Sequence, residues 1–126
     1  MGKRYLIDTN VIIDFGNNRI PSKQAQLLAS IIDGEPYISF ITKIELLGFS
    51  NPSEAVIEFA ENAIAIFCDE EILKQCVEIR KEKRIKLPDA LIAATALVHD
   101  FIILTRNTSD FSGIQGLEIQ NPYHLS

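Results

Sequence analysis

The sequence predicts a three-layer α/β/α sandwich with a mostly parallel central sheet of about five strands. Two observations support this fold class. Short apolar runs of strand length alternate with longer segments in which apolar residues recur at helical spacing. The first run is apolar at successive positions, which is typical of a strand that is covered on both faces, and a parallel sheet places helices on both faces. The alternation therefore favours a parallel sheet over a hairpin-built one.

Apolar spacing and turn residues place the elements in order along the chain. We expect strands over 3–7, 37–40, 63–67, 101–104 and 117–119, with an Asn121-Pro122 stop after the last. We expect helices over 10–15 and 21–32, from Thr42, after a Ser53 cap, over 69–84 and over 88–99, and a short turn or helix over 109–112. No repeat, low-complexity tract or linker interrupts them, so we interpret residues 1–126 as a single domain.

Proline, glycine and capping residues justify the helix limits. The Gly16-Asn17-Asn18 cluster ends the first helix, and Pro21 fits the first turn of the second, which closes at Asp33-Gly34. Thr42 and Glu45 are spaced as in a capping box, so the next helix is expected to open at Thr42. The inner stripe of the helix over 69–84 is expected to be Ile72, Leu73, Cys76 and Ile79.

Composition narrows the class of protein. A chain of 126 residues with 47% hydrophobic content can build one core of its own. No run reaches the roughly 18 apolar residues of a membrane span, and Asp8 precedes any signal-peptide core, so we expect a cytoplasmic protein without membrane contact. Cys68 and Cys76 lie too far apart along a helix for a disulfide, which predicts buried free thiols.

The net charge of −5 argues against a protein that grips nucleic acid mainly through phosphates. The distribution of charge softens this argument, because five basic residues fall within seven positions just before Asp89. They are Arg80, Lys81, Lys83, Arg84 and Lys86. They could attract RNA, or they could be a solvated helix end whose cations complement the helix dipole. The two interpretations are compatible.

Four acids fall where the chain leaves an expected strand or enters an expected helix. Asp8, Glu45 and Asp110 follow the first, second and fourth strands, and Asp89 begins a helix that leads into a parallel strand. All of these positions belong to the carboxyl edge of a parallel sheet. Carboxylates gathered there repel one another unless they share a cation, and an all-oxygen set suits Mg²⁺ or Mn²⁺.

Each of these acids also has a structural interpretation. Asp8 or Asn10 could cap the first helix, Glu45 could complete a capping box, Asp89 could complement a helix dipole, and Asp110 suits a turn. Capping explains the residue types, but it does not require that all of them share one edge of the sheet.

Four segments carry the polar positions in a recognisable order. They are 6–14 (LIDTNVIID), 38–48 (ISFITKIELLG), 87–96 (LPDALIAATA) and 104–111 (LTRNTSDF). In order and spacing they resemble the PIN-domain nucleases, in particular the toxin subunits of VapBC-type toxin–antitoxin pairs. The resemblance implies a metal-dependent endoribonuclease whose core acids are Asp8, Glu45 and Asp89. The supporting polar groups that it implies are Thr9, Asn10 and Thr105.

One position departs from the family pattern. Many members carry an acid where this chain has Asn107, and Asp110 lies three residues further on. Asn107 can coordinate through its carbonyl oxygen but brings no charge, so the site could hold one ion or two. We interpret Asp110 as a peripheral or water-mediated ligand, with a purely structural turn residue as the alternative.

These patterns lead to the hypothesis of metal-dependent phosphodiester hydrolysis in single-stranded or looped RNA, with one or two Mg²⁺ or Mn²⁺ ions. Arg106 and the basic run before Asp89 could draw RNA toward the acids. The resemblance further implies a cognate antitoxin and a homodimer. The main rival is an interaction module with this fold but no turnover. Acyl-phosphate chemistry on Asp8 is disfavoured, because Asn10 stands where a phosphatase of that type has a second acid.

Overall fold

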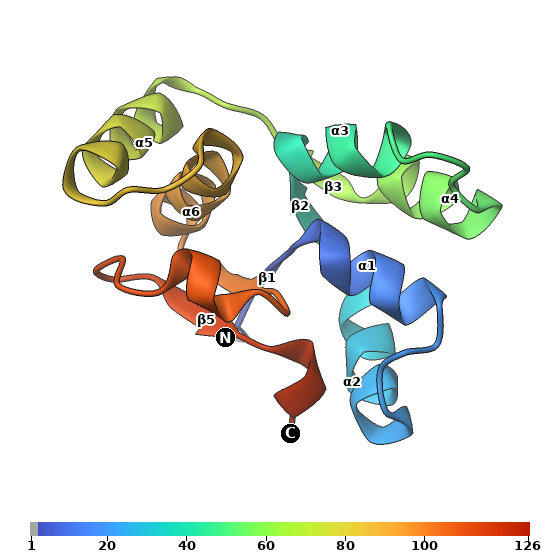
Figure 1. The fold of residues 1–126 in the computed structure, drawn as a ribbon. Coiled ribbons are helices and arrows are strands. Elements are labelled where there is room, and N and C mark those ends of the chain that lie inside the picture. The colour runs from blue at the N-terminus through green and yellow to red at the C-terminus, as the bar shows by residue number, and fades with distance from the viewer. Residues whose placement is uncertain (1–2) are drawn as a thin grey trace.

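A computed structural model describes residues 3–126, in which five strands form one sheet (Figure 1). The strands are β1 (Tyr5–Ile7), β2 (Tyr37–Ser39), β3 (Ile64–Ile66), β4 (Ile102–Leu104) and β5 (Glu118–Gln120). Their order in the sheet is β3-β2-β1-β4-β5, and every pairing is parallel. Parallel pairing requires long crossover connections, and helices supply them here.

Six α-helices and two 3₁₀ turns complete residues 3–126. The helices are α1 (Thr9–Gly16), α2 (Ser22–Asp33), α3 (Phe40–Leu47), α4 (Glu54–Asn62), α5 (Glu70–Glu82) and α6 (Leu87–His99), and the 3₁₀ turns are η1 (Thr108–Phe111) and η2 (Pro122–His124). Helices α1 to α4 cover one face of the sheet, and α5 and α6 cover the other. The predicted three-layer α/β/α sandwich is confirmed.

The two layers of core follow from the alternation of side chains along the central strands. Leu6 of β1 pairs with Ile103 of β4, and both pack among the side chains of α5 and α6. The next pair, Ile7 and Leu104, packs among the side chains of α1 to α4. All four side chains are buried, and each contributes about 1.5–3 kcal/mol when removed from water.

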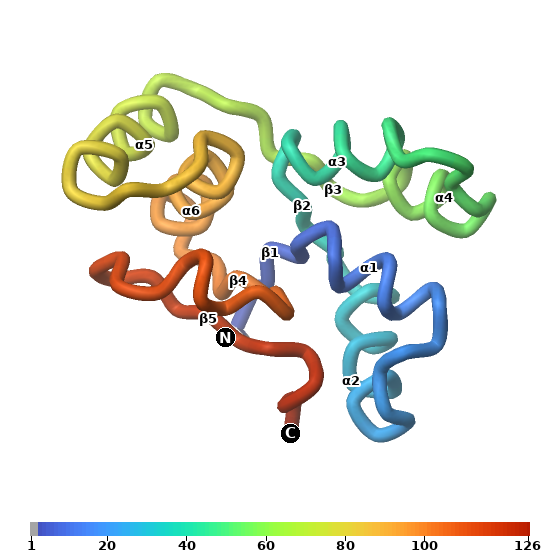
Figure 2. The backbone as a smooth tube through the Cα atoms, viewed as in Figure 1, coloured from blue at the N-terminus to red at the C-terminus, as the bar shows by residue number. Residues whose placement is uncertain are grey.

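The order in which strands are added to the sheet reverses at β1, and this reversal leaves a crevice between the ends of β1 and β4. From β1 the chain moves outward through β2 to β3, then returns over the opposite face to form β4 on the other side of β1 (Figure 2). Parallel sheets bind ligands beyond the carboxyl ends of the strands that flank such a switch point. Here those ends are Asp8, after β1, and Thr105, after β4.

The predicted opening of α3 was wrong. Phe40, expected to end the strand, is the first residue of the helix, because Ser39 is the N-cap and its hydroxyl accepts a hydrogen bond of 2.9 Å from the Ile41 amide. Thr42 therefore lies inside the helix, where its side chain is buried, and the expected capping box with Glu45 does not form.

Two expectations about burial were also wrong. Leu73 is 49% exposed, because α5 packs through a narrower stripe made by Ile72, Cys76 and Ile79. Cys68 is exposed, since it precedes the N-cap Asp69 and lies outside the helix, whereas Cys76 is buried as expected. Both thiols are free.

The strand limits shift by a few residues at most. The last strand, expected over 117–119, covers Glu118–Gln120, and the others are shorter than expected at one or both ends. Among residues 3–126, no helix combines the length and the apolar character needed to cross a membrane.

Candidate active site

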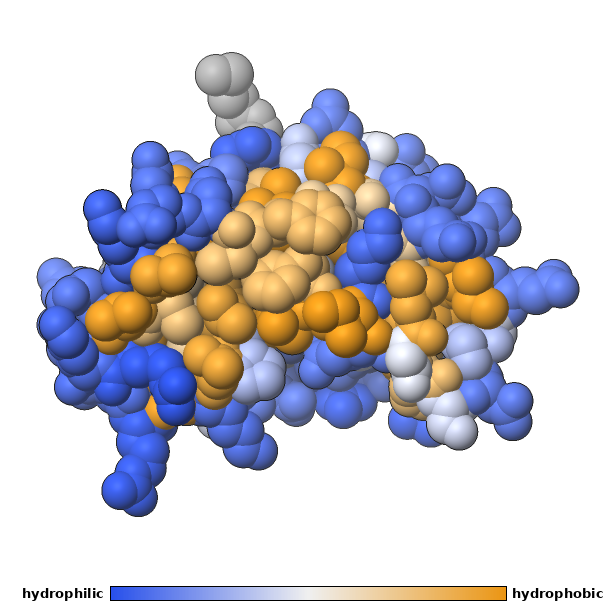
Figure 3. Space-filling model, turned by 90° about the horizontal axis from the view of Figure 1, so that it is seen from above, coloured by the Kyte–Doolittle hydropathy of each residue, from blue (hydrophilic) through white to orange (hydrophobic). Residues whose placement is uncertain are grey.

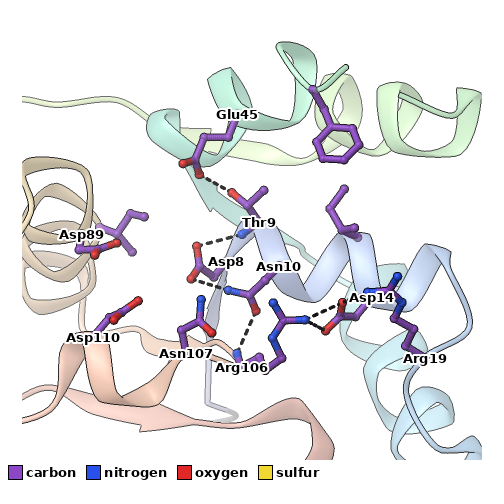
Figure 4. A pocket seen from close by; sticks show the side chains of 13 residues that line it. Asp8, Thr9, Asn10, Asp14, Arg19, Glu45, Asp89, Arg106, Asn107 and Asp110 are labelled. Atoms are coloured by element: carbon purple, nitrogen blue, oxygen red, sulfur yellow. Dashed lines mark hydrogen bonds and ion pairs between the residues drawn. The ribbon is translucent and has the colours of Figure 1, made fainter. Parts of the chain in front are cut away.

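A pocket of about 360 Å³ opens beyond the carboxyl ends of β1 and β4 (Figure 4). The four predicted acids, Asp8, Glu45, Asp89 and Asp110, all line it. Most of the predicted polar groups line it as well: Thr9, Asn10, Arg106 and Asn107. The structure thus brings together side chains from α1, α3, α6, η1 and the segment after β4 that are far apart in sequence.

Asp8 lies at the base of this pocket with both carboxylate oxygens engaged. Its backbone N–H donates to the Leu104 carbonyl at 2.9 Å, which joins the end of β1 to the end of β4. Oδ1 accepts from the Thr9 amide at 2.9 Å, so Asp8 is the N-cap of α1. Oδ2 accepts from the Thr105 hydroxyl at 2.8 Å and from the Asn10 amide group at 3.1 Å. Asp8 therefore both caps α1 and contributes a carboxylate to the pocket.

Burial raises the pKa of Asp8 above its ordinary value, because only 8% of the residue is exposed. The hydrogen bonds from Thr105, Thr9 and Asn10 favour the ionised form and oppose this effect, while the negative charge of Glu45 adds to it. A bound cation would offset the cost of burying the ionised carboxylate and its repulsion by Glu45.

A short network fixes the segment after β4 against α1. The Thr105 side chain is fully buried and accepts hydrogen bonds from the Asn10 side chain at 3.2 Å and from the Asn107 amide at 3.1 Å. Asn10 Oδ1 accepts from the Arg106 amide at 2.9 Å. Thr105 itself does not line the pocket, and its hydroxyl orients Asp8 by donating to Oδ2.

Glu45 projects from α3 toward Thr9 and lines the pocket (Figure 4). It is exposed, and it accepts a hydrogen bond from the Thr9 hydroxyl (Figure 4). Because Ser39 rather than Thr42 caps α3, Glu45 is a side chain of the helix interior and not part of a cap. The capping interpretation of Glu45 is therefore excluded.

Asp89 and Asp110 face the same space from the opposite side (Figure 4). Asp89 lies in the first turn of α6, and Asp110 lies in η1. Burial raises the pKa of Asp89, and the negative charges of Asp110 and Asp8 raise it further. The acids therefore lie near enough to repel one another.

The donor set of this pocket fits a hard divalent cation. Every charged side chain of the lining that can ligate a cation is a carboxylate, and two of the acids have raised pKa values that a bound cation would lower. In residues 3–126 no three His, Cys, Asp or Glu side chains stand close enough together to hold a metal ion as they are placed. Thr9 holds Glu45, and hydrogen bonds hold Asp8, so the acids share a pocket without forming a closed cage.

Comparison with known protein families matches residues 5–117 to the model of the PIN domain. The chain belongs to the PIN-domain family. The resemblance that the motifs indicated is therefore confirmed for the family.

Relatives of this PIN domain match over nearly their whole length. Ribonuclease VapC1 of Rickettsia felis is 34% identical over 129 residues, covering 90% of this chain and 92% of that protein. The structure of a toxin–antitoxin complex from Klebsiella pneumoniae aligns with a TM-score of 0.74 and 31% identity, covering 96% of this chain and 99% of that one. VapBC-1 from nontypeable Haemophilus influenzae aligns with a TM-score of 0.73 and 27% identity, covering 94% and 97%.

This PIN domain also contains a buried acid that the sequence reasoning missed. Asp14 is 1% exposed, and both its oxygens accept hydrogen bonds from Nη1 of Arg106, at 2.9 and 2.7 Å. Tyr123 donates to Oδ2 at 3.1 Å. A signal was available, because Asp14 follows the buried Val11 by three residues and so shares its face of the helix. Its partners lie far along the chain, so the sequence did not identify them.

The basic run before Asp89 does not reach the pocket. Its side chains from Arg80 to Arg84 line a separate hollow at the end of α5, and within residues 3–126 none of the five basic residues lines the acidic pocket. Arg80 and Lys81 lie in the last turn of α5, as the solvated helix-end interpretation expects. Of these five basic residues, Lys86 influences Asp89 electrostatically. Its positive charge lowers the pKa of Asp89, but burial raises that pKa by more.

Proposed function

We propose that this PIN domain is an endoribonuclease that hydrolyses phosphodiester bonds in single-stranded or looped RNA, as the toxin of a toxin–antitoxin pair. The single observation that carries the proposal is the pocket at the switch point of the sheet, where four acids from distant segments converge. The 34% identity to Ribonuclease VapC1 supports RNA as the substrate. RNA as the substrate favours the cytoplasm as the location.

We propose Asp8, Glu45 and Asp89 as the residues that hold one or two Mg²⁺ or Mn²⁺ ions, with Asp110 and Asn107 as further oxygen donors. When bound, the cation supplies Lewis-acid activation of water and neutralises charge at the phosphate. Glu45 is exposed, and within residues 3–126 no hydrogen bond or ion pair holds the Asp89 side chain, so both carboxylates can turn toward a ligand.

The chain's own residues orient the reacting groups. Thr105 and Asn10 hold Oδ2 of Asp8 in one direction, which spares the carboxylate from reorganising when substrate arrives. The Thr9 hydroxyl donates to Glu45, so it becomes able to donate to a phosphate oxygen when Glu45 turns toward a cation. Because Asp8 is buried at the base of the pocket, an RNA backbone has to enter the pocket to reach it. This depth favours single strands and loops over a regular duplex.

The test is cleavage of a mixed pool of labelled RNAs by the wild type and the Asp8→Asn variant, in EDTA, Mg²⁺ or Mn²⁺. We expect metal-dependent cleavage by the wild type and a loss of about 100-fold or more in the variant, which removes one ligand charge and little volume. Asp33→Asn is the matched control, because it neutralises an exposed acid at the end of α2, outside the pocket.

Two outcomes would contradict the proposal. Unchanged cleavage by Asp8→Asn with metal still bound would remove Asp8 from the mechanism. Absence of cleavage by the wild type, together with absence of Mg²⁺ binding in a calorimetric titration, would favour an interaction module without turnover.

We propose that a second protein binds this PIN domain and covers exposed apolar side chains on and beside α3 and α5. Figure 3 shows apolar side chains gathered across the face seen from above, on which these helices lie in Figure 1. The exposed apolar residues of this region are Ile44, Leu47, Phe49, Phe67, Leu73 and Val77. An apolar surface of this kind favours a protein partner over solvent. The structures of toxin–antitoxin complexes among the neighbours support an antitoxin as the partner. The homodimer expected from the motifs stays a prediction, which light scattering of the purified chain tests.

A further inference from the structure

The pocket that holds the four acids has a second end of opposite charge. Arg19 and Arg106 line it there, beside Asp14, on the side away from Asp89 and Asp110 (Figure 4). Two guanidinium groups meet one carboxylate, so this end carries a formal net charge of +1. The pocket of an acidic protein is thus positive at one end.

Asp14 acts as a buried anchor for these arginines. It lies on the inner face of α1 and is 1% exposed. Its contact with Nη1 of Arg106 and the hydrogen bond from Tyr123 hold the Arg106 side chain from below. An arginine held in this way loses little conformational freedom when it binds a ligand, because its position is already fixed.

Both arginines keep donors that their contacts with Asp14 do not use. The hydrogen bonds of the Arg106 side chain within residues 3–126 involve Nη1 alone, which leaves Nη2 and Nε able to donate. The side chain of Arg19 is 63% exposed, and its Nη1 stands 3.9 Å from Asp14, the longest of the ion pairs found in the described chain. A guanidinium fork with free donors matches the oxygens of a phosphate.

We propose that Arg19 and Arg106 form a phosphate subsite, which binds the RNA backbone one or more nucleotides away from the bond that is cut. This inference rests on the proposed function, because it takes the acidic end of the pocket as the place of cleavage. The backbone of a bound strand then runs along the pocket from the acids to the arginines. The subsite supplies locally the attraction that a net charge of −5 denies to the protein as a whole.

The alternative is that both arginines serve only the fold. This alternative fits Arg106 better than Arg19. Arg106 binds both oxygens of a buried carboxylate at short range, whereas the loose pair of Arg19 is exposed to solvent, where ion pairs contribute little to stability. Arg19 is therefore the residue whose substitution tests phosphate binding without unfolding the protein.

The experiment measures binding of a short fluorescein-labelled single-stranded RNA by fluorescence anisotropy over a series of salt concentrations. The protein is the full chain with Asp8→Asn, in Mg²⁺, so that the RNA is bound without being cut. Arg19→Ala is compared in this background with Lys23→Ala, which removes an exposed cation from the first turn of α2, outside the pocket. Circular dichroism confirms that each variant is folded.

We expect Arg19→Ala to weaken RNA binding by about three- to tenfold and to reduce the slope of log affinity against log salt by about one, as the loss of one phosphate contact does. Lys23→Ala should change neither quantity, and Arg19→Lys should restore part of both. Equal affinities and salt slopes for Arg19→Ala and Lys23→Ala would overturn the subsite.

Cleavage by the otherwise intact chain separates this inference from the proposed function. Arg19→Ala should raise KM for RNA and leave kcat nearly unchanged, because the arginine contacts a phosphate that does not react. A wild type that binds RNA through Arg19 but cuts none would refute the nuclease and keep the subsite. A wild type that cuts RNA with a KM unaffected by Arg19→Ala would refute the subsite and keep the nuclease.

Discussion

The two carboxylate oxygens of Asp8 make contacts of different kinds, so the choice of substitution at Asp8 determines which contact is lost. Oδ1 caps α1 through the Thr9 amide, and Oδ2 faces Thr105 and Asn10 in the pocket. Asparagine is as good an N-cap as aspartate and has nearly the same size. Asp8→Asn therefore keeps the start of α1 while removing the charge, and Asp8→Ala would confuse the loss of a cap with the loss of a ligand.

The pKa values of Asp8 and Asp89 predict how stability depends on pH and metal. Both pKa values are raised in the folded state, mainly by burial, so the folded protein binds protons more tightly than the unfolded chain. The contribution of these acids to the free energy of unfolding is greatest below the ordinary carboxyl pKa of 3.8 and is lost as pH rises through the raised values. At neutral pH the metal-free protein carries this electrostatic strain.

Mg²⁺ should therefore raise the melting temperature more at neutral pH than at about pH 4, where protons compete for the same carboxylates. Differential scanning calorimetry at both pH values, with and without Mg²⁺, measures the difference. The increase at neutral pH should shrink in Asp8→Asn. An equal increase at the two pH values would show that Mg²⁺ stabilises the protein elsewhere.

Arg106→Ala should lower the free energy of unfolding by about 2 kcal/mol, because it leaves the buried carboxylate of Asp14 with only Tyr123 and the distant Arg19. This figure is below the range for a fully buried pair, since the Arg106 side chain is 44% exposed and solvent screens it. Urea unfolding followed by circular dichroism measures the change. A loss as small as that of Arg19→Ala would contradict the role of Asp14 as an anchor.

Individual site residues differed in how far the sequence could predict them. Asp8, Glu45, Asp89 and Asp110 could be placed at one edge because each follows a strand or begins a helix, and all four line one pocket. Their roles as ligands stay predictions. The spacing of Asp14 to Val11 indicates its buried face of the helix, but no local pattern identifies its partners, which lie 92 and 109 residues away.

At the scale of elements, the hydroxyl of Ser39 determines where α3 starts and so where Glu45 lies. Ser39, the last residue of β2, is fully buried and caps the helix that follows at once, and Glu45 lies six positions further along. The sequence suggested Thr42 instead, since the spacing to Glu45 matched a capping box. Ser39 and Thr42 are both suitable N-cap residues. Which of them caps α3 depends on how the chain is buried there, and the sequence alone does not show that.

Ser39→Ala should lower the free energy of unfolding by about 1 kcal/mol through loss of the N-cap, and it should also lower kcat for RNA, because Glu45 depends on the position of α3. Ser53→Ala is the matched control. It removes the N-cap of α4, whose hydroxyl accepts from the Val56 amide at 3.2 Å, but α4 contributes no side chain to the pocket.

Urea unfolding and single-turnover cleavage of the two serine variants separate stability from activity. Similar losses of stability with a lower rate in Ser39→Ala alone would link the cap to the site. Equal cleavage rates in both variants would mean that Glu45 reaches its place without help from the cap.

At the scale of the whole molecule, the apolar face over α3 and α5 predicts where a partner protein binds. Ile44 is 62% exposed on α3, and Phe67, in the link between β3 and α5, is 66% exposed. Such large apolar exposures are retained on a surface that another protein covers. Their substitution should act on association and leave the fold intact, because neither side chain belongs to the buried core.

Ile44→Asp and Phe67→Asp should each weaken binding of the proposed antitoxin by about tenfold or more, through loss of buried apolar area at the interface. Calorimetric titration of the purified antitoxin into each variant measures the effect. Lys74→Asp is the control, because it places the same acid at an exposed polar position of α5. Equal affinities for all three variants would move the interface to another face.

The fold class was within reach of the sequence, but the order of the strands was not. Alternating strands and helices restrict the chain to a parallel sheet with two covered faces. Whether β4 joins the free edge of β3 or returns to β1 depends on which apolar faces fit together, and no local pattern encodes that choice.

The central place of β1 has a consequence for the time at which the protein can become active. β1 is synthesised before β4, its neighbour in the sheet, and Asp8 completes its hydrogen bonds only when Thr105 has been added to the chain. Asp110 and Arg106 come from the same late segment. A nascent chain therefore has no assembled pocket until the segment after β4 has left the ribosome. For a ribonuclease, this order of assembly delays activity until the segment that carries Thr105 and Asp110 has been made.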